Sequence, residues 1–162
     1  MPFSYHSFQE IWRRAGGREN AKCFYCEVRH IDGFTLDCSH LDHARDENYD
    51  NPDRGILECL ECHLKRHIHL YFFVLLKGKK KKSKECRFAC MSLVFRIVAG
   101  EDRWDGKNIP SSKSDIKRNK KRISKIFSEQ ISEATIQAHE MGFEPKDIAW
   151  ANEKVMLLKE MI

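Results

Sequence analysis

Two pairs of cysteines have the spacing that metal chemistry requires. Each pair has the form C-x2-C, with Cys23 and Cys26 in the first and Cys59 and Cys62 in the second. A tight turn at this spacing lets two thiolates hold one ion, and four thiolates complete the tetrahedral shell of a structural Zn²⁺. One pair alone could be a redox motif, whereas two pairs separated along the chain predict a zinc site. Because such a shell leaves no open position, we expect this zinc to join two chain segments rather than to catalyse a reaction.

Three further cysteines, Cys38, Cys86 and Cys90, lie outside these pairs. Cys86 and Cys90 are four residues apart among apolar residues, which is typical of a buried helix face. A disulfide framework would require a secretion signal, and the start of the chain lacks the basic and apolar regions of one. We therefore expect a cytoplasmic protein of a bacterium, phage or mobile element, or a nuclear protein in a eukaryotic host.

Histidines and an aspartate cluster near the cysteine pairs. His40, Asp42 and His43 precede the second pair, and His63 and His67 follow it. A neutral imidazole can act as a general base near pH 7. A carboxylate and an imidazole can hold a divalent cation that keeps positions open for a phosphate. These residues are therefore of the types that phosphodiester hydrolysis requires.

The order of these residues resembles that of the HNH, or ββα-metal, endonucleases. In this family a strand ends in a histidine, a loop and a second strand follow, and a helix opens with C-x2-C-H. Here His40 precedes the string Arg54-Gly-Ile-Leu-Glu-Cys-Leu-Glu-Cys-His63 at the separation of the family. The phage recombination endonuclease VII group is the most similar in local sequence, since it shares the His-Leu-Asp-His string and the Arg-Gly before the second cysteine pair. The resemblance covers residues 22–67 and implies a metal-dependent DNA endonuclease that leaves a 5′-phosphate.

The resemblance implies catalytic roles in two alternative registers. In the endonuclease VII-like register, which we prefer, Asp42 is a ligand of Mg²⁺ or another divalent cation and His43 is the base. In the generic register His40 is the base, and Ser39, a poor ligand, stands where many members have Asp or His. Both registers make His63 a ligand of the catalytic cation. His67 is then a further ligand of this cation or a phosphate contact.

Two residues depart from the family pattern. Arg54 stands where generic members have an Asn that helps to hold the metal-binding loop, and His63 stands where the endonuclease VII group has an Asn ligand. Asn48 or Asn51 could fasten the loop instead. This mixed pattern fits either a functional hybrid or an enzyme that has lost its activity.

Basic residues are concentrated in two segments. Lys77–Arg87 holds seven Lys/Arg and one acidic residue, as does Lys113–Lys125, so each segment carries +6 and the rest of the chain carries −7 within a total of +5. This distribution favours a partner with a phosphate backbone, although solvated helix faces or an import signal give the same pattern. The residues expected to hold nucleic acid are Arg54, Lys65, Arg66, Lys79, Lys80, Lys81, Lys82, Lys117 and Lys121.

Apolar periodicity predicts a mainly α fold with a small zinc-stapled ββα-metal motif and a helical C-terminal half. The predicted parts are an N-terminal helix in residues 1–20, a zinc-bound nuclease core in 21–76, a basic linker and helix in 77–112, and a basic helix with a terminal helix in 113–162. The helix of the third part is expected over Glu85–Val98. Ser112 or Ser114 can cap the long basic helix, and Pro145 suits the first turn of the last one.

The last helix carries an apolar seam formed by Ile148, Ala151, Val155, Leu158 and Ile162. Such a seam is usually core, but at the end of a chain it also suggests a homodimer. The motifs and the charge together predict a DNA endonuclease that is structure-selective or weakly sequence-specific, because backbone contacts carry no base information. Branched DNA is one candidate substrate, and RNA would use the same site. The alternative is a non-catalytic zinc-containing module that binds nucleic acid or a protein.

Overall fold

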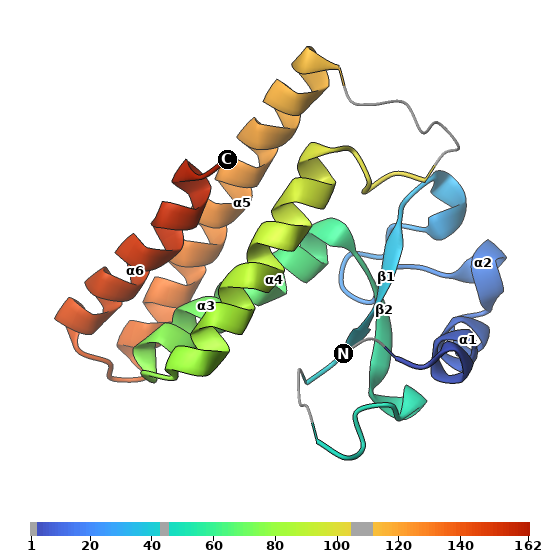
Figure 1. Cartoon of the computed structure of the whole chain (residues 1–162), viewed down its shortest axis with the longest axis horizontal. Helices are drawn as coiled ribbons and strands as arrows, with labels where there is room; N and C mark the ends of the chain where they lie inside the picture. The colour runs from blue at the N-terminus through green and yellow to red at the C-terminus, as the bar shows by residue number, and fades with distance from the viewer. Residues whose placement is uncertain (1–2, 43–45, 105–111) are drawn as a thin grey trace. The chain divides into compact units, whose positions relative to one another are not determined.

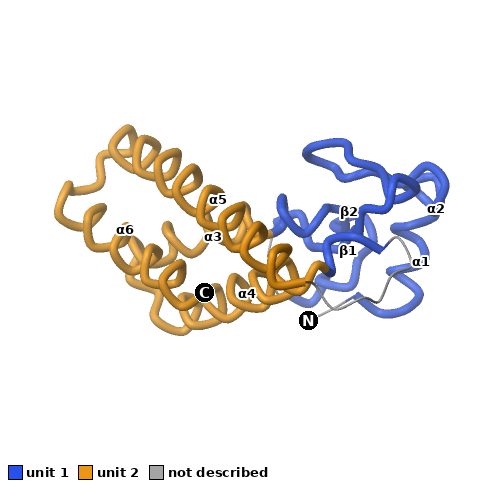
Figure 2. The backbone as a smooth tube through the Cα atoms, turned by 90° about the horizontal axis from the view of Figure 1, so that it is seen from above, with its two compact units in different colours: residues 1–63, 101–109 blue, residues 64–100, 110–162 orange. Residues whose placement is uncertain are grey.

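The computed structural model describes residues 3–42, 46–104 and 112–162, so His43 lies outside the described residues. The protein is mostly helical and has one two-stranded antiparallel sheet, in agreement with the predicted fold class at this level. The chain divides into two compact units, which are residues 1–63 with 101–109 and residues 64–100 with 110–162 (Figure 2). Within the described residues no helix combines the length and apolar character needed to cross a membrane.

The first unit holds two short helices, two 3-10 turns and the sheet (Figure 1). Its elements are α1 (Tyr5–Arg14), α2 (Gly17–Asn20), η1 (His30–Asp32), β1 (Leu36–His40), η2 (Pro52–Arg54) and β2 (Gly55–Cys59). The Ser4 side chain caps α1 by accepting a hydrogen bond from the Ser7 backbone N–H at 3.3 Å. Gly16 follows the helix with φ of 90°, which a glycine adopts without strain. The predicted N-terminal helix is therefore confirmed.

The register of the sheet decides which residues share a face. Leu36 lies opposite Cys59 and His40 lies opposite Gly55. Because side chains alternate along a strand, Leu36 and His40 point to one face and Asp37 points to the other. The face of Leu36 packs in a buried cluster with α1 and the second strand, formed by Phe3, Ile11, Ala21, Cys23, Leu36, Leu57, Cys59 and Cys62.

A close approach of α1 to the sheet explains the glycine at the start of β2. A Cβ atom on Gly55 would lie 2.1 Å from Ile11 Cδ1, which is far inside contact distance. Residues 101–104 also belong to this unit, where Trp104 N–H donates to the Gly33 carbonyl at 2.9 Å. The Arg103 guanidinium lies 4.1 Å from the centre of the Phe34 ring. Residues 101–104, which the sequence predicts as part of the basic linker and helix of 77–112, thus belong to the first unit instead.

The second unit is built from helices. Helix α3 (Leu60–Leu76) begins in the first unit and continues into the second, which also contains α4 (Lys80–Val98), α5 (Lys113–Glu140) and α6 (Pro145–Glu160). Ser112 and Asp115 form a capping box at the start of α5, in which each side chain binds the backbone N–H of the other. The core side chains include Phe72, Leu93, Val94, Ile97, Ile123, Phe127, Ile131 and Ala134.

One prediction about this unit needs correction. Helix α4 begins at Lys80 rather than near Glu85, so most of the predicted basic linker is helical. Lysine is a good helix former, and its side chain needs no apolar neighbour, which is why apolar periodicity alone does not show this start. The seam residues of α6, from Ile148 to Leu158, are buried within the unit. These residues therefore form core, as such a seam usually does, and the homodimer stays a prediction.

Candidate metal centre

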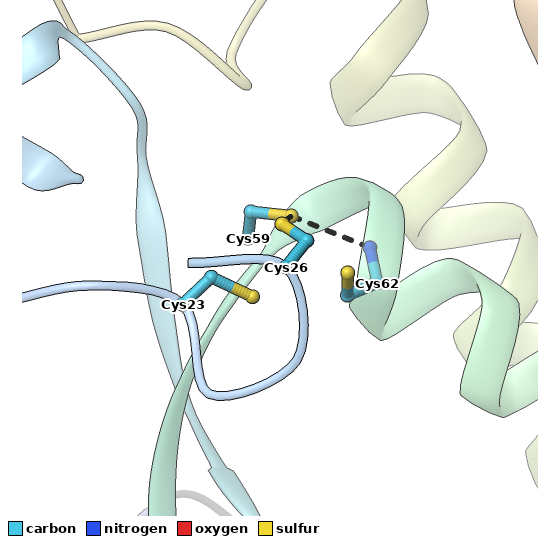
Figure 3. Close-up of side chains that lie close together, drawn as sticks. All are labelled: Cys23, Cys26, Cys59 and Cys62. Atoms are coloured by element: carbon cyan, nitrogen blue, oxygen red, sulfur yellow. Dashed lines mark hydrogen bonds between the residues drawn. The ribbon is translucent and has the colours of Figure 1, made fainter. Parts of the chain in front are cut away.

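The four predicted cysteines converge in the first unit (Figure 3). The Sγ atoms of Cys23, Cys26, Cys59 and Cys62 all lie within 4.8 Å of one another, and all four cysteines are free of disulfides. The Sγ atoms of Cys26 and Cys59 are 3.7 Å apart. A tetrahedron of sulfurs at the usual zinc–sulfur distance of about 2.3 Å has edges of about 3.8 Å. The cluster therefore fits a structural zinc ion in donor type and in spacing.

Local backbone structure places the first cysteine pair. Cys23 N–H donates to the Val28 carbonyl at 2.8 Å, and Glu27 N–H donates back to the Cys23 carbonyl at 3.0 Å. Glu27 takes a left-handed conformation with φ of 65°, which closes the turn. Phe24 N–H donates to the Leu57 carbonyl at 2.8 Å and so fixes this turn against β2. The second cysteine pair lies where β2 ends and α3 begins. Figure 3 shows this pair directly beside the turn that carries Cys23 and Cys26.

Hydrogen bonds among the sulfurs set the protonation of the thiols. The pKa of the Cys23 thiol is lowered because Cys59 and Cys62 hydrogen-bond to its sulfur. The bond to Cys23 in turn raises the pKa of Cys59 to about 12 and raises the pKa of Cys62. Zinc would stabilise further thiolates, so its binding should release protons.

The His40 imidazole, the base of the generic register, is held firmly at the end of β1. Its Nε2 lies 2.5 Å from the Tyr49 carbonyl oxygen, so this nitrogen carries a hydrogen and donates a hydrogen bond to that oxygen. The ring stacks on Phe3 with a centroid distance of 3.9 Å and an angle of 13°. These contacts fix the tautomer and the orientation of the imidazole, as an orienting group does for a catalytic base.

Asp42 binds Arg54, which fastens the loop between the two strands. The Asp42 Oδ2 atom lies 2.8 Å from Arg54 Nη2, and Asp46 Oδ1 lies 2.6 Å from Arg54 Nη1. Arg54 holds the pKa of the Asp46 carboxyl below its usual value. Asn51 instead caps η2 by accepting from Asp53 N–H at 2.9 Å. Arg54 therefore fastens the loop, a role that the sequence analysis assigns to Asn48 or Asn51. Its guanidinium is directed at carboxylates.

His63 lies between two carboxylates that the sequence interpretation did not single out. Its Nδ1 lies 2.9 Å from Asp37 Oδ2, and its Nε2 lies 3.8 Å from Glu58 Oε1. Asp37 and Glu58 face each other across the sheet. Glu58 is fully buried, although glutamate side chains are usually exposed. Only the register of the hairpin shows that these carboxylates share a face, and the sequence does not give that register.

Of the predicted catalytic residues that the structure describes, His40 and His63 do not lie together. His63 contacts the face of the sheet that carries Asp37, whereas His40 points to the opposite face. Ser39 is buried, and its hydroxyl has no hydrogen-bond partner among the described residues. Within residues 3–42, 46–104 and 112–162, the four cysteines are the only group of three or more Cys, His, Asp or Glu close enough to share an ion. A catalytic cation site thus remains a prediction that depends on residues around His43.

The predicted nucleic-acid contacts lie mainly in the second unit. Lys65 and Arg66 lie on α3 with His67 and are half-buried, whereas Lys79–Lys82, Lys117 and Lys121 are exposed. Asn119 Nδ2 donates to the Val98 carbonyl at 3.4 Å, so the start of α5 lies beside the end of α4. Since α4 has 19 residues and is about 28 Å long, the two basic segments lie at opposite ends of this helix (Figure 1).

Comparison with known proteins adds no family to this description. The chain matches no protein-family model, no curated protein and no solved structure.

Proposed function

We propose that the chain is a metal-dependent DNA endonuclease of the HNH type, with a structural zinc held by four cysteines. The observation that carries the proposal is the order β1, β2, α3 with the sulfur cluster at the β2–α3 junction. This order supports it because the histidine-bearing end of β1 and the first turn of α3 belong to one compact unit. The exposed lysines of α4 and α5 would hold the DNA backbone.

The preferred roles follow the endonuclease VII-like register. His43 would take the proton of the attacking water, and Asp42 would hold a divalent cation that stabilises the leaving oxygen. Asp42 already accepts two hydrogen bonds from Arg54, at 2.8 and 3.2 Å. Cation binding would therefore replace one of the two carboxylate partners of Arg54 and leave Asp46 as the other. His63 would have to turn from Asp37 to act as a ligand.

A nicking assay tests this proposal. Supercoiled plasmid and a four-way DNA junction are incubated with the full chain and Mg²⁺ or Mn²⁺, with EDTA in a parallel reaction. His43→Ala and Asp42→Asn should each lower the cleavage rate by roughly 100-fold or more, the usual contribution of a positioned acid or base. His139→Ala is the control, because His139 lies on α5 in the other unit. Absence of metal-dependent cleavage by the parent protein on every substrate would refute the proposal.

A second function is favoured by the pairing of the predicted ligands. Asp42 is bound to Arg54 and His63 to Asp37, as expected if these residues stabilise a fold rather than hold a cation. The chain would then be a non-catalytic zinc module that binds nucleic acid or a protein. This function predicts salt-sensitive DNA binding that His43→Ala and Asp42→Asn leave unchanged, without cleavage in the same assay.

A further inference from the structure

Helix α4 exposes two large aromatic side chains to solvent. Phe88 is 77% exposed and Phe95 is 58% exposed, although both rings are apolar. They are seven residues apart, which is about two turns and about 10.5 Å along the helix, so they lie on one face. Neither ring contacts another ring or a cation within the part of the chain that the structure describes. Such exposure has a free-energy cost that a bound partner would remove.

The same face carries positive charge that is not neutralised. Lys81 and Lys84 lie seven and four residues before Phe88, the spacings that place residues on one helix face. Both lysines are exposed. No lysine from Lys77 to Lys84 forms an ion pair with any described residue. The exposed stripe of α4 therefore consists of Lys81, Lys84, Phe88, Ser92 and Phe95, with cations at one end and aromatic rings along the rest.

We propose that this stripe, which we call the α4 stripe, binds single-stranded DNA. Aromatic rings stack on unpaired bases while lysines neutralise the phosphates, and this combination is typical of surfaces that bind single strands. A duplex hides its bases within the stack and would leave the two rings without partners. The choice of DNA rests on the proposed function, whereas binding to the stripe requires no cleavage.

Two other occupants fit the α4 stripe less well. A membrane-bound helix needs a broad apolar face, but the stripe offers only two large apolar side chains, which are separated by Ser92 and follow two lysines. A second copy of the chain packed in parallel would bring Lys81 and Lys84 against the same lysines of its partner. The uncompensated charge thus favours a polyanion.

Fluorescence anisotropy with a labelled 16-nucleotide oligo(dT) and a 16-base-pair duplex tests the proposal, with the full chain and no added Mg²⁺. Phe88→Ala and Phe95→Ala should each weaken oligo(dT) binding by roughly 5- to 150-fold, since a stacked base contributes about 1–3 kcal/mol. Duplex binding should change less than about twofold. Ile136→Ala is the matched control, because Ile136 is an exposed apolar residue of α5 that lies outside the stripe.

The salt dependence gives a second readout. Replacing Lys81 and Lys84 together by glutamine should lower the slope of log K against log salt by about 1.4, at about 0.7 for each single-strand phosphate neutralised. Phe88→Ala should leave that slope unchanged, because its ring carries no charge. Both variants should keep the far-UV circular dichroism of the parent, since the substituted side chains are exposed.

Several results would overturn the proposal. These are parent-like oligo(dT) binding by both phenylalanine variants, equal losses on single strand and duplex, and an equal loss in Ile136→Ala. Loss of binding to anionic phosphatidylserine vesicles in Phe88→Ala, without an effect on oligo(dT), would instead assign the stripe to a membrane. Conversion of a dimer to a monomer by Phe88→Ala would assign it to a second copy. Tighter binding of oligo(U) than of oligo(dT) would overturn the choice of DNA. Because no cleavage is measured, failure of the nuclease proposal leaves these outcomes unaffected.

Discussion

Removal of zinc should unfold the first unit and leave the helical unit folded. The change is Cys62→Ser, or extraction of the metal from the parent protein with a chelator. Cys62 is 8% exposed and its sulfur belongs to the cluster of four, so the substitution removes one ligand at a site that the chain cannot easily rearrange. Cys38→Ser is the matched control, because Cys38 lies on the same hairpin and outside the sulfur cluster.

The magnitude follows from the small core of this unit. Its buried cluster contains four large apolar side chains, which are Phe3, Ile11, Leu36 and Leu57. At about 1.5–3 kcal/mol for each, their burial contributes about 6–12 kcal/mol. Zinc binding to a structural site contributes about 10–16 kcal/mol near pH 7. Loss of zinc therefore removes a free energy comparable to what this apolar cluster supplies, and the unit should be unfolded at 25 °C.

Circular dichroism and tryptophan fluorescence separate the two units. Helices α1 and α2 have 10 and 4 residues, and α3 to α6 have 17, 19, 28 and 16. The first unit contains α1, α2 and residues 60–63 of α3, so its unfolding should remove only about 19% of the helical signal. Trp12 and Trp104 lie in the first unit and Trp150 lies in the second. The emission should therefore shift to the red, and calorimetry of the zinc-free protein should show one transition in place of two.

The parent protein from which zinc has been extracted decides whether the sulfur cluster stabilises the first unit. If it kept its emission spectrum and both unfolding transitions, the sulfur cluster would not be what stabilises this unit. The same conclusion would follow if Cys62→Ser bound zinc as tightly as the parent, or if Cys38→Ser were as unstable as Cys62→Ser.

Three further predictions concern other parts of the fold. Arg54→Lys should lower the urea midpoint of the first unit, because lysine cannot bind two carboxylates in the fork geometry of arginine. An unchanged midpoint would argue against the fastening role. Phe127→Ala should cost the helical unit about 3–5 kcal/mol in a thermal melt, since this ring is fully buried, and a loss below about 1 kcal/mol would contradict its placement. Ser112→Ala should cost about 1 kcal/mol at pH 7. The Ser112 hydroxyl also donates to the Asp115 carboxylate and so holds the pKa of Asp115 below its usual value of 3.8. The part of the stabilisation that comes from this bond is present above pH 3.8 and is lost as the pH falls below 3.8 through the lowered pKa. The difference between the thermal melts of parent and variant should therefore become smaller at low pH, and a difference that grew with acid would refute the assignment.

The helices could be predicted from local signals. The start of α5 has a serine three residues before an acidic residue, and α6 begins with a proline at its first position, so local signals predict where both helices start. The start of α4 carries no such signal. Lys79 has no side-chain cap bond, and a run of lysines reads equally well as a solvated linker or a solvated helix.

The metal centre and the predicted catalytic site differ in how much tertiary structure they require. The C-x2-C spacing places two sulfurs together through a single turn, so only the meeting of two turns had to be inferred. His40 and His63 depend on the pairing of β1 with β2, because a shift of one residue would move His40 to the other face. That register is set by tertiary contacts such as the packing of Ile11 against Gly55, which the sequence does not display.

Metal analysis combined with zinc X-ray absorption tests the central claim most directly. The claim is that Cys23, Cys26, Cys59 and Cys62 bind one zinc ion. It predicts one zinc per chain and a first shell of four sulfurs at about 2.3 Å, which Cys38→Ser should leave unchanged. A protein purified in the presence of zinc that held none, or a shell that contained nitrogen or oxygen in place of sulfur, would contradict the account.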